Sequence, residues 1–200
     1  IWVASHDQGL GFLDESQDKL LFLRDQPSQG YDMPVKFANV LFADGPVLWI
    51  GTPYGVYKYD KRWQLFDVFK MPDFRSGSCL PEIQSVAQLK PNELLLCSWT
   101  CGLFQFHPKE GGAFHRKPDL FLNPKDQNFV DIKHVCKQND STFWYATSHF
   151  LAGESGKRTF TIRPGGWTKE IIQENYFHKT LVAKNGLIWA GSRSGIVKID

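Results

Sequence analysis

The sequence predicts an all-β fold built from a repeated unit, and two observations carry that prediction. Aromatic residues are abundant, with 7 Trp, 16 Phe and 6 Tyr in 200 residues, and aromatic side chains favour strands over helices. A short motif also recurs, in which an apolar residue, Trp, any residue and a small residue are followed by Ser or Thr. Its copies occupy residues 1–5, 48–52, 94–98, 143–147 and 188–192.

The five copies are evenly spaced. Their second residues stand at positions 2, 49, 95, 144 and 189, so successive copies are 47, 46, 49 and 45 residues apart. Leu95 replaces Trp in the third copy. A period of roughly 45 residues with four short strands per unit is that of a propeller blade. The predicted fold is therefore a β-propeller of four-stranded antiparallel blades.

Turn residues divide each complete unit into four predicted strands. The predicted strands of the second, third and fourth units are residues 37–42, 47–52, 55–60 and 63–68; 83–89, 93–98, 103–107 and 113–117; and 129–135, 142–147, 158–163 and 167–171. A glycine follows the motif at Gly9, Gly55, Gly102 and Gly195. The fourth unit lacks this glycine, and a longer loop is expected there from Ser148 to Lys157.

The whole chain, residues 1–200, is predicted to be one propeller segment. Its repeat units cover about 1–35, 36–80, 81–125, 126–174 and 175–200. The first unit is expected to supply strands two to four, and the last unit strands one to three. Because these pieces overlap and do not complete one blade, an incomplete arc of about five units is favoured over a closed ring. The start on Ile1, within a strand motif, indicates a piece of a longer polypeptide.

The repeated tryptophans have a mechanical explanation. A Trp on the second strand can lie flat between neighbouring blades, and the small residue two places later lets the next blade approach closely. We therefore predict that these residues are core and not a ligand platform: Trp2, Trp49, Trp144 and Trp189.

Composition and motifs exclude several classes of function. The 23 basic and 21 acidic residues are intermixed, with a net charge of +2, so no basic face for nucleic acid is predicted. No apolar run approaches the length of a membrane helix. The six His residues form neither H-x-x-x-H nor H-E-x-x-H, so no metal site is predicted. The G-x-S-x-G, P-loop and dinucleotide-binding fingerprints are absent too, and no cofactor is predicted.

The cysteines leave the redox compartment open. Cys97 and Cys101 stand four residues apart across a predicted hairpin, and the other two are Cys79 and Cys136. A disulfide or half a metal site is possible at Cys97 and Cys101, but an unpaired buried thiol is favoured.

Two copies of the motif, each taken with the strand after it, resemble the two-component regulator propeller repeat, whose pattern is roughly D-G-x-L-W-I-G-T-x-x-G-L-x-x-Y-D. They are residues 48–52 with 55–60, and residues 185–192 with 195–200. The resemblance covers all five units, two of them well, two fairly and the third weakly. Leu95 and the missing glycine of the fourth unit depart from the pattern.

This resemblance implies a function. Such repeats form the extracytoplasmic, here periplasmic, sensor region of hybrid two-component regulators, mostly from Bacteroidetes. A membrane helix and a histidine kinase core come after them, and would lie outside this chain. Many members of the family sense oligosaccharides, typically as dimers. The chain itself is then a small-molecule sensor segment and not an enzyme. A propeller enzyme of the lyase type and a plain protein-interaction propeller are the alternatives.

Propellers usually bind ligands on one face, through loops between strands two and three and between blades. Aromatic residues there can stack on a sugar, while polar and charged residues read its hydroxyl groups. The candidate ligand-binding residues on these loops are His6, Asp7, Tyr54, Trp99, His149 and Arg193.

Overall fold

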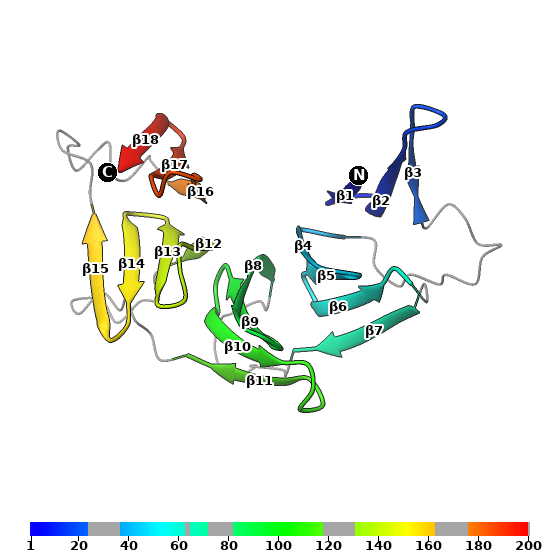
Figure 1. Ribbon diagram of the computed structural model, residues 1–200, viewed down its shortest axis with the longest axis horizontal. Helices are drawn as coiled ribbons and strands as arrows, with labels where there is room; N and C mark the ends of the chain where they lie inside the picture. The colour runs from blue at the N-terminus through cyan, green and yellow to red at the C-terminus, as the bar shows by residue number, and fades with distance from the viewer. Residues whose placement is uncertain (24–36, 63–64, 72–81, 118–130, 163–175, 200) are drawn as a thin grey trace.

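The computed structural model describes residues 1–23, 37–62, 65–71, 82–117, 131–162 and 176–199. These residues contain no α-helix and form five antiparallel sheets. The sheets follow one another around an arc, with the N-terminal and C-terminal sheets at its two ends (Figure 1). Each sheet is one blade of the predicted propeller, and the predicted fold class is confirmed. The described part of the chain contains no helix long and apolar enough to cross a membrane.

The strands are numbered along the chain. Blades 1 and 2 contain β1 (Trp2–Ser5), β2 (Gly9–Asp14) and β3 (Lys19–Phe22), then β4 (Val40–Asp44), β5 (Val47–Thr52), β6 (Gly55–Asp60) and β7 (Leu65–Lys70). Blade 3 contains β8 (Ile83–Lys90), β9 (Glu93–Ser98), β10 (Gly102–His107) and β11 (Ala113–Arg116). Blades 4 and 5 contain β12 (Ile132–Lys137), β13 (Thr142–Thr147), β14 (Leu151–Ser155) and β15 (Arg158–Ile162), then β16 (Phe177–Val182), β17 (Ile188–Ser192) and β18 (Gly195–Ile199).

Within every blade the strands pair in chain order, and the first strand of blades 2 to 5 lies nearest the middle of the arc (Figure 1). Blades 1 and 5 have three described strands each. The motif Trp is on β1 in blade 1 and on β17 in blade 5, so β1 corresponds to a second strand and β18 to a third. The expected strand content of the two end units is therefore confirmed.

The second and third strands of the second unit have the predicted bounds, but the fourth unit differs. Its predicted long loop contains β14, so residues 158–162 form the fourth strand and not the third. The hydroxyl oxygen of Thr147 accepts hydrogen bonds from the amides of His149 (3.3 Å) and Phe150 (3.0 Å), and this makes a tight turn without glycine. The predicted strand at 167–171 lies outside the described residues.

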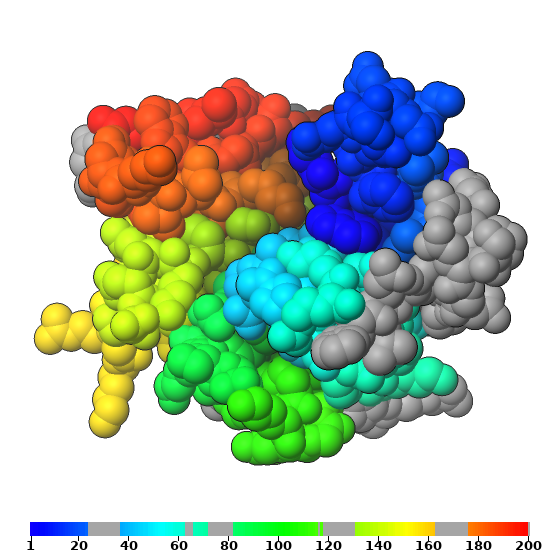
Figure 2. Space-filling view, turned by 45° about the vertical axis from the view of Figure 1, so that its right-hand side comes forward, coloured from blue at the N-terminus to red at the C-terminus, as the bar shows by residue number. Residues whose placement is uncertain are grey.

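Alternate side chains of each strand pack against the two neighbouring blades, as the pleat requires. Leu48 and Ile50 of β5 lie in a cluster with blade 1, whereas Trp49 lies in a cluster with β8 to β10. Similar clusters join blades 3 and 4 and blades 4 and 5. The space-filling view shows the blades as successive packed layers (Figure 2). The core therefore lies between the blades.

The motif tryptophans fill these interfaces with one exception. Trp49 and Trp144 are only 5% and 7% exposed, and the ring centroid of Trp49 lies 5.7 Å from that of Phe106 in the next blade. Trp189 is 38% exposed. Its blade neighbour Ile196 is 76% exposed, whereas Val56, at the same repeat position, is 0% exposed. Trp189 therefore differs from the prediction, because no described residue covers this face of blade 5.

Polar contacts join the inner strands of successive blades. The hydroxyl oxygen of Ser85 on β8 accepts a hydrogen bond from the amide of Val135 on β12, at 3.2 Å. At the same position one blade later, Nδ1 of His134 accepts from the amide of Thr180 on β16, also at 3.2 Å. An inner strand has an unpaired edge toward the middle of the arc, and a buried amide without a partner is destabilising. Ser85 and His134 each satisfy one amide on such an edge.

Gly51 and Gly191 occupy the same repeat position, which makes them a matched pair. A Cβ atom on Gly51 would lie 2.5 Å from a methyl carbon of Val40 and 2.7 Å from one of Ile83, whereas on Gly191 it would meet nothing within 4 Å. We expect Gly51→Ala to lower the free energy of unfolding by about 1–3 kcal/mol through overpacking. We expect Gly191→Ala to change it by less than about 0.5 kcal/mol. Urea unfolding of both variants measures the difference, and equal losses would contradict the packing described.

His134 should make stability depend on pH. Because the Thr180 amide can only donate, Nδ1 of His134 must be unprotonated, and burial followed by the charge of Lys179 lowers its pKa from 6.5 to about 4. In the unfolded chain the imidazole regains its ordinary pKa of about 6.5, so it binds a proton more readily there than in the folded chain. The contribution of His134 to the free energy of unfolding is therefore complete above pH 6.5. It falls as the pH drops from 6.5 to 4, by at most about 3 kcal/mol. Urea unfolding at pH 7 and pH 4.5 should show a smaller pH dependence for His134→Gln. An unchanged dependence would contradict this assignment.

Candidate functional site

The loops between second and third strands lie at the same end of the blades as the starts of the inner strands. In three blades the first loop residue donates its amide hydrogen to the carbonyl of the residue that comes just before the inner strand. These pairs are Trp99 with Glu82 (3.2 Å), Ser148 with Asp131 (3.2 Å) and Arg193 with Tyr176 (3.3 Å). The two sets of residues therefore form one face, here called the loop face.

A β-bulge recurs on this face. The strand register shifts between Ile83 and Ser85, between Ile132 and His134, and between Phe177 and Lys179. A bulge leaves one residue unpaired and re-aims its side chain. The three residues at the bulges and the residue at the corresponding place in blade 2 are polar, and we name them the inner ring: Asn39, Gln84, Lys133 and His178.

Lys133 joins three blades on the loop face. Its Nζ lies 4.1 Å from the ring centroid of Tyr176 in blade 5 and 5.6 Å from that of Trp99 in blade 3. Each cation–π contact of this kind contributes about 0.5–2 kcal/mol. Partial burial lowers the pKa of Lys133, while the charge of Asp131 acts in the opposite direction. The ammonium group is thus held between two aromatic rings in a partly desolvated place.

Three positively charged side chains act on His178. The pKa of His178 is lowered, first by burial and then by the charges of Lys133, Arg193 and Lys179. Two carboxylates each come one residue before an inner strand, and both accept hydrogen bonds. Asp131 accepts from the Ser148 hydroxyl at 3.4 Å, and Glu82 accepts from the side-chain amide of Asn39, also at 3.4 Å.

The structure places all six predicted binding residues in loops at this end of the blades and brings some of them together. Trp99 and Arg193 belong to the group around Lys133 and Tyr176. His6 and Asp7 contact each other through Nδ1 and Oδ1 at 3.2 Å, and the His6 ring lies 5.4 Å from that of Phe37. Tyr54 and His149 are exposed in their loops. No described side-chain contact joins either one to another of the six.

Sequence reasoning missed Lys133, Tyr176 and the rest of the inner ring. One signal was present in units 2 to 5: a polar residue directly follows a buried apolar residue at, or just before, the start of the inner strand. The pairs are Ala38-Asn39, Ile83-Gln84, Ile132-Lys133 and Phe177-His178. The signal is weak, because the polar residue is of a different type each time.

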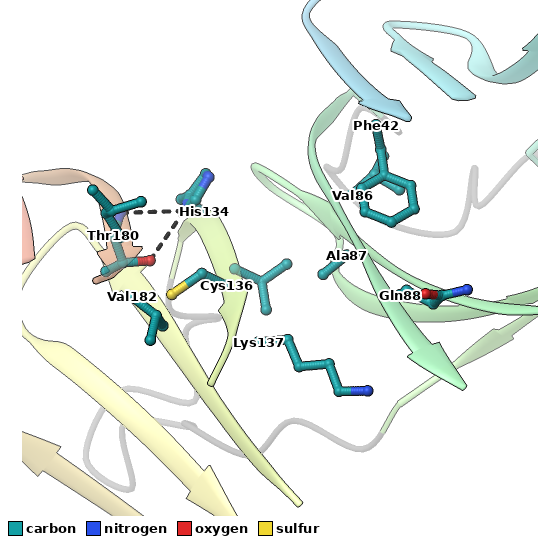
Figure 3. A pocket seen from close by; sticks show the side chains of 11 residues that line it. Phe42, Val86, Ala87, Gln88, His134, Cys136, Lys137, Thr180 and Val182 are labelled. Atoms are coloured by element: carbon teal, nitrogen blue, oxygen red, sulfur yellow. Dashed lines mark hydrogen bonds between the residues drawn. The ribbon is translucent and has the colours of Figure 1, made fainter. Parts of the chain in front are cut away.

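A hollow lies along the inner strands. It is a cavity of about 560 Å³ between β4, β8, β12 and β16 (Figure 3). Phe42, Val86 and Val182 give it an apolar wall. Its charged residue, Lys137, forms an ion pair with Asp140 at 2.8 Å. His134 and Thr180, which also line the cavity, are hydrogen-bonded to each other.

The cysteine predictions are partly confirmed. Cys97 is a buried free thiol, as favoured, and burial raises its pKa. Cys101 is disulfide-bonded, which corrects the expectation of an unpaired thiol at that position. Cys136 is free, and Cys79 lies outside the described residues. Among the described residues, no group of three or more His, Cys, Asp or Glu side chains is placed to hold a metal ion.

Comparison with known proteins identifies the fold. No protein-family model and no curated protein matches the chain. Solved structures do match over its whole length. One is the extracellular domain of the putative hybrid two-component system BT3049 from B. thetaiotaomicron, with 16% identity and a TM-score of 0.70. Another is the extracellular domain of the putative one-component system BT4673 from the same organism, with 16% identity and a TM-score of 0.71.

The chain spans 25% of the length of each of these two domains. The computationally designed Ika8 protein also matches, with 12% identity, a TM-score of 0.62 and 54% of its length covered. The two natural structures come from the class of signalling protein that the repeat resembles in sequence, and their extracellular location agrees with the predicted one. At these identities the likeness establishes the fold, and the chain is a five-bladed β-propeller arc.

Proposed function

We propose that this chain is a segment of the periplasmic sensor region of a bacterial hybrid two-component protein, and that it binds an extracellular oligosaccharide. The signal would pass to a histidine kinase elsewhere in the parent protein. In this proposal the chain itself is not an enzyme. The membrane helix and the contacts of a homodimer belong to the parent protein.

Two findings support the location and the class of protein. The natural structures that the chain resembles are extracellular domains of two-component and one-component systems. The disulfide at Cys101 fits an oxidising compartment such as the periplasm, because disulfides are rare in the cytosol. Function has to be argued from a site and not from a fold. The ligand part of the proposal is therefore argued from the loop face.

The observation that carries the proposal is a half-exposed aromatic ring beside polar side chains from several blades. Trp99 is 42% exposed on the loop face, with Lys133 and Tyr176 of the next two blades beside it. Sugars bind where an aromatic ring packs on their apolar face and polar groups read their hydroxyls. A ligand here would touch blades 3, 4 and 5 at once, so it could favour one arrangement of the blades over another.

Calorimetric titration of the chain with a panel of oligosaccharides tests the proposal. We expect Trp99→Ala to weaken binding about tenfold or more, equivalent to about 1.4 kcal/mol of lost contact. Trp189→Ala is the matched control, because Trp189 is similarly exposed, at 38%, but lies within strand β17 and away from the loops. Equal effects of the two variants, or no binding of any oligosaccharide to the folded chain, would contradict the proposal.

A further inference from the structure

Three nitrogen-bearing side chains gather at one side of the loop face, from blades 4 and 5. Lys133 lies 4.1 Å from the Tyr176 ring, the amide of Arg193 donates to the carbonyl of Tyr176, and the ring of His178 lies 6.1 Å from the Tyr176 ring. Tyr176 is thus the common neighbour of the side chains of Lys133 and His178 and of the backbone of Arg193, and the charge of the Arg193 side chain acts on His178. Within the described parts of the chain, none of the three forms an ion pair.

Two carboxylates lie near this group, and among the described residues neither forms an ion pair with it. Asp131 accepts a hydrogen bond from Ser148, and Glu82 accepts one from Asn39 in the neighbouring blade. Lys179 adds a further positive charge that acts on His178. Lys117, by contrast, is neutralised by Glu154 at 3.1 Å, away from the inner ring. On the side of the face that carries Lys133, three cations (Lys133, Lys179 and Arg193) therefore stand against two carboxylates, Asp131 and Glu82.

An anionic ligand would stabilise the ammonium group of Lys133, which is partly desolvated and has no ion-pair partner among the described residues. An ammonium group that is partly desolvated and unpaired is less stable than one with a counter-charge. The cation–π contacts of Lys133 compensate in part, and they leave N–H groups of its ammonium free to donate. Carboxylate and phosphate groups are the usual acceptors of charge-assisted hydrogen bonds from Lys and Arg, and sulfate carries a similar tetrahedral set of oxygens.

We propose that the ligand of the loop face is an acidic oligosaccharide, with a sugar ring on Trp99 and its carboxylate or sulfate group between Lys133 and Arg193. This inference rests on the proposed function and narrows its ligand class. Trp99 distinguishes an acidic sugar from a simple anion, because stacking requires a sugar ring. An acidic peptide would use the cations without needing Trp99.

Three probes of similar size test the inference by calorimetry: trigalacturonate, galactotriose and triglutamate. The first two differ only by carboxylate in place of hydroxymethyl groups. In low salt, we expect trigalacturonate to bind about tenfold or more tightly than galactotriose, and the difference to shrink at high salt. Lys133→Gln and Arg193→Gln should each remove most of this preference. Lys157→Gln removes the same charge from the exposed β14–β15 turn, at the other end of the strands, and should leave the preference unchanged.

The outcomes separate the two proposals. Equal binding of trigalacturonate and galactotriose would overturn the acidic-ligand inference and leave the oligosaccharide sensor standing. Binding of triglutamate as tight as that of trigalacturonate, unaffected by Trp99→Ala, would also overturn it. If neither sugar binds to the folded chain, both proposals fail. Should Lys133→Gln fail to fold by circular dichroism, Arg193→Gln decides the question, because Arg193 is exposed in a loop.

Discussion

Each blade of this chain has two apolar faces, and only a neighbouring blade can bury them. Along β5, Leu48 and Ile50 contact one neighbour while Trp49, between them, contacts the other. A sheet with this pattern is unstable alone and stable in a stack. The close approach of Ile83 to Gly51 shows how tightly the stack packs, since a single methyl group there would overlap with it.

The stack also has to satisfy polar groups between its layers. On the inner side, Ser85 and His134 accept hydrogen bonds from the amides of the next blade. Farther out, Glu154 of blade 4 pairs with Lys117 of blade 3 at 3.1 Å and accepts the hydroxyl of Tyr145 at 2.8 Å. Buried polar contacts of this kind favour one arrangement, because shifting a blade would leave each group without its partner. The Ser85 and His134 contacts thereby fix each inner strand against the next one.

The sequence predicted those features that repeat with the same residues in each unit, and it missed those that do not. Strands two and three of the second unit were predicted with their correct bounds, because they contain the motif and its glycine. β14 was missed because glycine served as the marker of that turn, whereas the Thr147 hydroxyl makes the turn in blade 4. Trp189 was predicted as core because the sequence treats all five copies as equivalent, although packing depends on what lies beside each blade.

The loop face was predictable in outline and not in detail. Placing Trp99 and Arg193 in loops required only the repeat, and both lie in the group around Lys133. The inner ring gave only a weak signal, because Asn, Gln, Lys and His share no residue type. Three of its four members stand at a β-bulge, which the sequence does not reveal. Cys101 was misjudged because an unpaired buried thiol was favoured at both Cys97 and Cys101, and only Cys97 is one.

The central claim is that the inner ring and the adjoining loops form the ligand site. Hydrogen–deuterium exchange of the chain with and without trigalacturonate tests it most directly. The account predicts slower exchange in residues 82–84, 99–101, 131–133 and 176–178, where the inner ring meets the loops. Protection confined to the hairpins at the other end of the blades, such as residues 44–47 and 90–93, would contradict it.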